Sequence, residues 1–233
     1  MTESTTDDGA LAERFDRVTA SVVDACAAAG RPVGEVTTIV VTKFQPTSLV
    51  RDLYDLGVRD VGENRHQEAQ SKSAELADLD GLRWHFVGQL QSKKARQARR
   101  YASAVHSLDR DSVVDALADE TAGSALDGFV QVNLTDDPGR GGVPESEVER
   151  LVERILSTPG LVLRGVMAVA PLGEEARPAF ARLRAVSERV RSIAPEADAI
   201  SAGMSHDFAD AVAEGATHLR IGTAITGKRP GPG

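Results

Sequence analysis

The chain has 233 residues, of which 41% are hydrophobic and 27% charged, and a formal net charge of −8 at pH 7. It is long enough for a core without disulfide or metal support, and its acidity argues against binding to nucleic acid or anionic membranes. One cysteine excludes a disulfide framework, no apolar run reaches the roughly 18 residues of a membrane span, and the acidic start is unlike a signal peptide, so we expect a cytoplasmic protein.

The chain begins with a polar segment, residues 1–8, which is predicted to be disordered. Apolar residues at helical spacing then predict a leading helix over 10–30. Beyond it, short β-rich runs alternate with amphipathic segments. Strands are expected at 37–43, 58–61, 83–88, 103–107, 128–134, 161–168, 198–202 and 217–221. Helices are expected at 47–57, 63–78, 92–101, 110–123, 144–157, 175–194 and 206–215.

Eight strand signals that alternate with helices predict a parallel α/β fold. A single closed (β/α)8 TIM-type barrel fits the count and the spacing. An open doubly wound sheet is the alternative and usually has fewer strands. No linker interrupts the alternation, so we expect one barrel domain with its leading helix over residues 9–229 and a flexible tail over 230–233.

Lys43 ends the first predicted strand, in the stretch IVVTKFQP at 39–46. In a (β/α)8 barrel the chemistry lies where the strands end. The chain contains five lysines and 22 arginines, and only a lysine amine can lose its proton and attack an aldehyde to form a Schiff base. That role requires a side chain directed into a barrel mouth lined by valine and isoleucine. The alternative is a lysine that extends from the strand end into water.

The ends of the seventh and eighth predicted strands indicate a phosphate site, because barrels often bind phosphate in these two loops. Gly203 and Gly222 allow backbone amides to approach an anion closely, and Ser205 and Thr223 add hydroxyl groups. Ser205 is also expected to cap the helix over 206–215. Arg220, flanked by apolar residues, is expected to be buried and to need a carboxylate or a ligand atom as its partner.

Other kinds of site find little support in the sequence. His85 and His106 lack the spacing typical of metal ligands, and no G-x-S-x-G motif supports a catalytic triad. Basic residues over 93–100 are expected to form a solvated helix face. Arg140 lies in a loop that is flexible by composition, and its role stays open.

The chain resembles the pyridoxal phosphate homeostasis protein family over roughly residues 35–229. The matching segments are, in order, VTKF, GENRHQEAQSK, RWHFVGQLQSKK, VHSLD, VQVN, RGVMAVAP and SAGMSHDFADAVAEGATHLRIGTAITG. The resemblance implies a barrel like the N-terminal domain of alanine racemases and pyridoxal 5′-phosphate (PLP) as its cofactor. The implied cofactor contacts are Lys43 as a Schiff base, Ser205, Gly222 and Thr223 at the phosphate, Met204 in the same loop, Arg220 at the pyridine nitrogen, and Asn64 and His85 at the remaining edges.

The chain departs from the family pattern at several positions. Arg65 stands where many members have an aromatic residue, and Phe44 replaces a small or polar residue after the lysine. Ala202, the TGK segment at 226–228 and Arg140 are further departures. None of them alters Lys43 or Ser205.

A racemase needs a second base besides its lysine, and the resemblance implies a tyrosine for that role. The chain has two tyrosines, Tyr54 and Tyr101, and both fall on predicted helices. We therefore expect a monomeric PLP carrier without substantial catalysis, which delivers PLP to apo forms of PLP-dependent enzymes. A PLP-dependent, racemase-like enzyme acting on amino acids is the first alternative. An aldolase-type enzyme that uses Lys43 on a phosphate-bearing substrate is the second.

Overall fold

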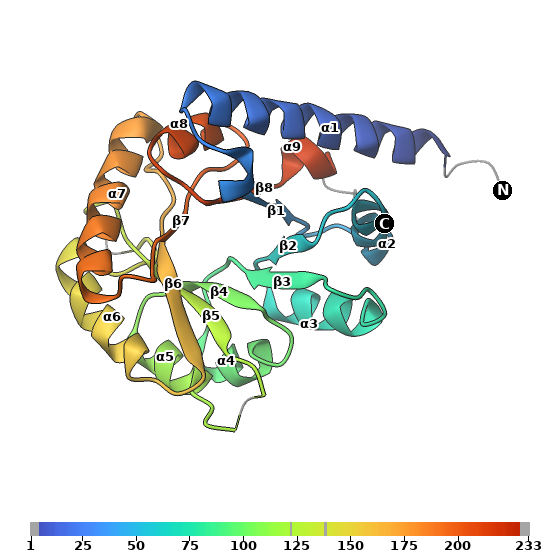
Figure 1. The fold of residues 1–233 in the computed structure, drawn as a ribbon. Helices are drawn as coiled ribbons and strands as arrows, with labels where there is room; N and C mark the ends of the chain where they lie inside the picture. The colour runs from blue at the N-terminus through green and yellow to red at the C-terminus, as the bar shows by residue number, and fades with distance from the viewer. Residues whose placement is uncertain (1–4, 122, 138, 229–233) are drawn as a thin grey trace.

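The computed structural model describes residues 5–121, 123–137 and 139–228. Within them, eight parallel strands close into a barrel in chain order, with helices around its outside (Figure 1). The strands are β1 (Thr37–Val41), β2 (Asp60–Glu63), β3 (Arg83–Phe86), β4 (Ala104–Leu108), β5 (Leu126–Gln131), β6 (Leu161–Met167), β7 (Ala199–Ser201) and β8 (His218–Ile221). The prediction of a (β/α)8 barrel is confirmed, and the open sheet is wrong.

The helices follow the strands as expected, with shifted ends. They are α1 (Thr5–Ala28), α2 (Thr47–Asp55), α3 (His66–Glu75), α4 (Ser92–Ala98), α5 (Asp111–Leu117), α6 (Val148–Leu156), α7 (Ala176–Ile193), α8 (Phe208–Ala213) and α9 (Thr223–Thr226), with short 3-10 turns at Val33–Glu35 and Glu145–Glu147. Helix α9 was not predicted. Helix α1 includes residues 5–8, although these residues were expected to be disordered. Polar and acidic residues are compatible with the N-terminus of a helix. Residues 1–4 and the predicted tail lie outside the described part of the chain.

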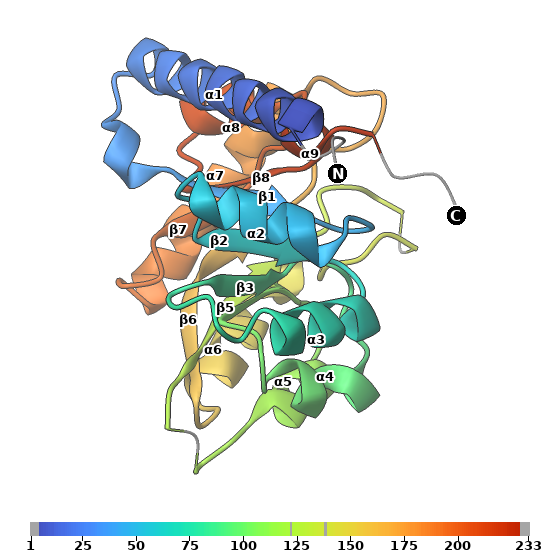
Figure 2. The same cartoon turned by 90° about the vertical axis from the view of Figure 1, so that its right-hand side faces the viewer.

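The main hydrophobic core lies between the barrel wall and the surrounding helices. Strand residues such as Val40 and Val61 belong to the same buried cluster as Leu53 of α2 and Leu183 of α7. Helix α1 packs across α8 and α9 in both views (Figures 1 and 2). No helix of the described residues is both long and apolar enough to span a membrane.

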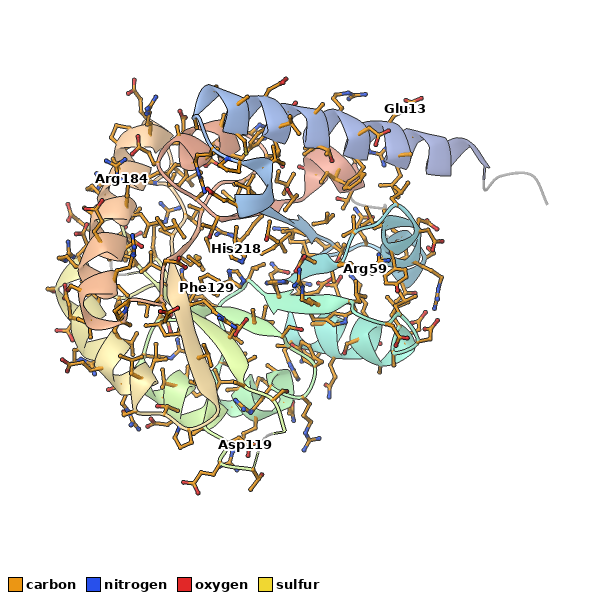
Figure 3. The ribbon with its side chains drawn as sticks, in the orientation of Figure 1. Glu13, Arg59, Asp119, Phe129, Arg184 and His218 are labelled. Carbon is orange, nitrogen blue, oxygen red and sulfur yellow. The ribbon has the colours of Figure 1, made fainter. Side chains whose placement is uncertain are left out.

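The inside of the barrel contains a second hydrophobic cluster, which is small and separate from the main core. That cluster consists of Ala104, Phe129, Met167 and Ala199. Phe129 packs with its ring centroid 5.2 Å from that of His218, and both side chains lie near the centre of the barrel (Figure 3). Buried polar side chains occupy much of the remaining interior, so hydrogen bonds, which are directional, decide how these side chains are oriented.

Candidate functional site

Lys43 lies in a turn just beyond the C-terminal end of β1. The strand stops at Val41, two residues earlier than predicted, and the Lys43 side chain is exposed. The following residue, Phe44, has a φ of +66°, which turns the chain out of the sheet. Of the two alternatives left open by the sequence, the exposure of Lys43 agrees with a side chain that extends from the strand end, and its amine is open to a ligand at the barrel mouth.

Arg220 is buried inside the barrel, with 5% of its surface exposed. Its Nη1 donates to Ser201 Oγ at 2.6 Å and its Nη2 to the Ala168 carbonyl oxygen at 2.8 Å. No carboxylate forms an ion pair with it among the described residues. Burial lowers the pKa of Arg220 to about 10, although the charge of Asp207 opposes this shift. A buried guanidinium held only by neutral oxygens keeps donor capacity for a ligand acceptor.

A chain of hydrogen bonds connects Arg220 to the opposite side of the barrel. Ser201 Oγ lies 2.8 Å from His106 Nδ1, and His106 Nε2 lies 3.0 Å from His85 Nδ1. His85 Nε2 lies 2.8 Å from Asp60 Oδ1. We call these five residues the interior chain. They come from β8, β7, β4, β3 and β2, so the barrel closure itself brings them together.

The charges at its ends give the interior chain a direction. Burial lowers the pKa of His106 well below its usual value, so this imidazole is neutral. Burial alone would raise the pKa of Asp60, but hydrogen bonds from His85 and Arg83 lower it to about 2. Arg220 donates to Ser201, so the arrangement that gives every member a partner has the Ser201 hydroxyl donating to His106 Nδ1, His106 Nε2–H to His85 Nδ1, and His85 Nε2–H to the Asp60 carboxylate.

The loop after β7 is shaped by Gly203 and Asp207. A Cβ at Gly203, whose φ is +92°, would lie 2.7 Å from Ala211 Cβ, so the position requires glycine. Asp207 Oδ1 accepts a hydrogen bond from the Met204 N–H at 2.5 Å. Helix α8 begins only at Phe208 as a result, and the prediction that Ser205 caps it is wrong. Ser205 instead lies half-buried within the loop.

The loop after β8 lies beside the loop after β7, because the Arg220 N–H donates to the Gly203 carbonyl oxygen at 2.9 Å. Gly222 precedes the short helix α9, which begins at Thr223. Several backbone N–H groups of the two loops lack a protein acceptor among the hydrogen bonds of the described residues. They include those of Ser205, His206, Thr223 and Ala224. Free amides in two adjacent loops are suited to binding an anion.

Asn64 and His85 occupy different depths. Asn64 follows β2, and its buried Oδ1 has no hydrogen-bond partner among the described residues. The chain passes so close to Gly88 that a Cβ there would lie 2.3 Å from the Asn64 carbonyl oxygen. His85 lies deeper, within β3, and both of its ring nitrogens have protein partners. Contact between His85 and a ligand stays a prediction. Because both ring nitrogens already have partners, such a contact would use the face of the imidazole ring.

The strand ends thus bring most of the predicted residues to one mouth of the barrel. These are Lys43, Asn64, Met204, Ser205, Gly222 and Thr223, with Arg220 beneath them. Ser201, His106 and Asp60 were not among the predicted site residues. A signal was present, because all three are polar residues within predicted strands.

Comparison with known proteins starts from the family model described as alanine racemase, N-terminal domain, which matches residues 34–230. The crystal structure of alanine racemase from Corynebacterium glutamicum is 16% identical to this chain, with a TM-score of 0.73. The match covers 97% of this chain and 62% of the racemase chain, and it shows that the fold is shared. A crystal structure of an unknown protein from Bifidobacterium adolescentis is 25% identical over 96% of this chain and 97% of its own, with a TM-score of 0.89. Fold, site and family model define a barrel of the alanine racemase N-terminal-domain class.

Closer relatives narrow the class. Proteins named pyridoxal phosphate homeostasis protein are 41% identical in Mycobacterium tuberculosis, over 88% of this chain and 87% of the relative, and 35% identical in Escherichia coli, over 94% and 95%. The PipY structure of Synechococcus elongatus PCC7942 with PLP bound is 33% identical over 92% of this chain and 99% of its own, with a TM-score of 0.77. The chain belongs to the pyridoxal phosphate homeostasis protein family.

Proposed function

We propose that this protein binds PLP at the barrel mouth, covalently as a Schiff base at Lys43 Nζ, and takes part in PLP homeostasis in the cytoplasm. The observation that carries the proposal is Arg220, a buried guanidinium that has no carboxylate partner among residues 5–121, 123–137 and 139–228. It pairs in register with Ile39, four residues before Lys43 on the neighbouring strand. Arginine does not give up its proton, so it donates to a ring nitrogen and leaves that nitrogen unprotonated.

The other groups at the mouth fit the remaining parts of PLP. The free amides of the loops after β7 and β8, with the Ser205 and Thr223 hydroxyls, suit a phosphate. The unpaired Asn64 Oδ1 offers a hydrogen-bonding group at another edge. PLP supplies an aldehyde for the lysine and an electron sink, and the sink is weak when the ring nitrogen is unprotonated.

The positions of the tyrosines support a carrier rather than a racemase-like enzyme. Tyr54 OH donates to the Asp80 carbonyl oxygen at 2.8 Å on the outside of the barrel. Tyr101 OH lies 3.3 Å from His66 Nδ1, at the junction of α3 and α4. Neither hydroxyl belongs to the mouth. We propose that the protein acts as a monomer and supplies apo forms of PLP-dependent enzymes.

Addition of PLP to the purified protein tests the binding site. We expect a visible absorption band, and borohydride should fix one PLP on Lys43, located by peptide mass spectrometry. Lys43→Ala should lose the band and the label because the amine is gone. Lys93→Ala, which removes an exposed lysine on α4, should keep both. Equal labelling of the wild type and Lys43→Ala would disprove the Schiff base at Lys43.

The carrier role is tested separately with PLP-loaded protein and a panel of amino acids. We expect PLP to pass to an apo enzyme without net conversion of the amino acids. Catalytic turnover that disappears in Lys43→Ala would instead favour the enzyme.

A further inference from the structure

A buried group of charges lies directly behind the Lys43 turn. Lys72 of α3, with 6% of its surface exposed, places Nζ 2.7 Å from Glu63 Oε1, 2.7 Å from Glu68 Oε1 and 2.8 Å from the Thr42 carbonyl oxygen. All three ammonium protons therefore have acceptors. We call Lys72, Glu63 and Glu68 the Lys72 cluster.

The Lys72 cluster holds the residues on both sides of Lys43. On one side, Lys72 binds the Thr42 carbonyl oxygen, and Thr42 Oγ1 donates to Glu63 Oε1 at 2.7 Å. On the other side, the Phe44 N–H donates to Glu68 Oε1 at 2.5 Å. Lys43 itself contributes nothing to these contacts. Its backbone is fixed by its two neighbours, so its side chain stays free to react.

Phe44 is in a conformation that needs such support. Its φ of +66° is in the left-handed region, and it is the one non-glycine residue with positive φ in the described chain. This region is unfavourable for a residue with a Cβ and is maintained only where the surroundings impose it. The Arg65 guanidinium also lies over the Phe44 ring, 4.7 Å from its centroid, so two departures from the family pattern contact each other.

Charge explains why the centre of the cluster is a lysine. Burial raises the pKa of Glu63, and the nearby charge of Glu68 acts in the same direction, while the Lys72 ammonium opposes both effects. Without Lys72, the buried Glu63 carboxylate and the partly exposed Glu68 carboxylate would lie close together with no cation between them. They would separate or take up protons, and Glu68 would no longer be held against the Phe44 N–H.

We propose that Lys72 is a positioning residue, which acts through Glu63 and Glu68 to hold the Lys43 turn in the conformation that receives the PLP aldehyde. The proposal rests on the proposed function for the identity of the ligand. The geometry of the turn can be tested without any ligand.

The main test compares Lys72→Met with Lys93→Met, which removes an exposed ammonium from α4. Two quantities are measured: the rate of PLP uptake, from visible absorbance, and hydrogen exchange of the Phe44 amide in the ligand-free protein, by NMR. In Lys72→Met we expect uptake at least tenfold slower and exchange at least tenfold faster, and in Lys93→Met no change in either. The proposal would be overturned if Lys72→Met took up PLP, and exchanged the Phe44 amide hydrogen, at the same rates as the wild type.

A rescue experiment separates positioning from general damage. Glycine adopts positive φ without strain, whereas alanine does not, and both remove the Phe44 ring. Phe44→Gly in the Lys72→Met background should therefore recover most of the uptake rate, and Phe44→Ala should not. Equal rates in the two double variants would contradict the proposal.

Two further outcomes are informative. If Lys72→Met does not fold, Glu68→Ala removes the acceptor of the Phe44 N–H from a partly exposed position and should give the same two changes. If the wild type takes up no PLP, the proposed function fails, and exchange of the Phe44 amide still decides whether Lys72 holds the turn.

Discussion

Ser201 shows how much one hydroxyl group does inside this barrel. It accepts a hydrogen bond from Arg220 and donates to His106, so it joins the guanidinium to the two histidines of the interior chain. All three side chains are buried, with Ser201 and His106 fully inaccessible. Loss of this hydroxyl leaves two buried polar groups without their partner, which costs more than a single average hydrogen bond.

We therefore predict that Ser201→Ala lowers the free energy of unfolding by about 1 to 3 kcal/mol in urea denaturation. Ser107→Ala is the matched control on β4. Ser107 is equally buried, but its Oγ has no hydrogen-bond partner among the described residues, so its replacement should be neutral or stabilising. A larger loss for Ser107→Ala than for Ser201→Ala would contradict the assigned hydrogen bonds.

At this scale the sequence predicted that Arg220 is buried and needs a partner, but not which partner. The partners, Ser201 and the Ala168 carbonyl oxygen, belong to β7 and the end of β6. Their distance depends on strand register and barrel closure, which no local pattern encodes. The left-handed conformation of Phe44 was not predicted for a similar reason, because it depends on contacts with α3.

At the scale of elements, the approach of β6 to β7 depends on Gly165. A Cβ at this position would lie 1.8 Å from the Ala199 carbonyl oxygen, and φ at Gly165 is +155°. The two strands pair in register here, Gly165 with Ala199 and Met167 with Ser201. Any added side chain must push β7 away, and Ser201 would move with it.

Gly165→Ala is accordingly predicted to destabilise the protein by about 3 kcal/mol or to prevent folding, because backbone atoms cannot yield as side chains do. Gly34→Ala is the control, since a Cβ there has no atom within 4 Å and φ is ordinary. Its effect on urea unfolding should stay within about 0.5 kcal/mol. Similar midpoints for the two variants would argue against the close strand contact.

The alternation of strands and helices was predictable because each element has its own period of apolar residues. The residues at which the elements begin and end were less predictable. Helix α8 starts two residues late because Asp207 binds the Met204 amide instead of continuing the helix. Helix α9 has four residues, too few for a periodic pattern, and it forms where the chain leaves β8. The two loops proposed to bind phosphate could be chosen from the sequence because glycine and hydroxyl residues follow two consecutive strands.

At the scale of the whole molecule, the polar barrel interior connects folding stability to pH. Burial lowers the pKa of His218 to about 4, and the charges of His85, Arg83 and Arg220 act in the same direction while Asp60 opposes them. Burial also lowers the pKa of His106 well below its usual value. Both imidazoles are neutral in the folded barrel and become protonated more readily in the unfolded chain, whose histidines titrate near their usual pKa of about 6.5.

The sign of the effect follows from proton binding. Between about pH 6.5 and 4 the unfolded state binds more protons at these histidines than the folded state, so stability falls as the pH falls. For His218 alone the loss is on the order of 3 kcal/mol across this range. Asp60 acts at lower pH: its folded pKa of about 2 is below the ordinary aspartate value of 3.8, so its contribution to stability is lost as the pH falls from about 4 to 2.

We expect the urea midpoint to decrease steadily from pH 7 to pH 4, before most carboxylates titrate. His218→Gln should reduce this slope, because the variant removes a group that only the unfolded chain protonates in that range. His206→Gln, at an exposed loop position, should keep it. The prediction would be contradicted if the urea midpoint stayed constant down to pH 4, or if His218→Gln left its pH dependence unchanged. Either result would mean that water or a structural change removes the effect of burial on the pKa of His218.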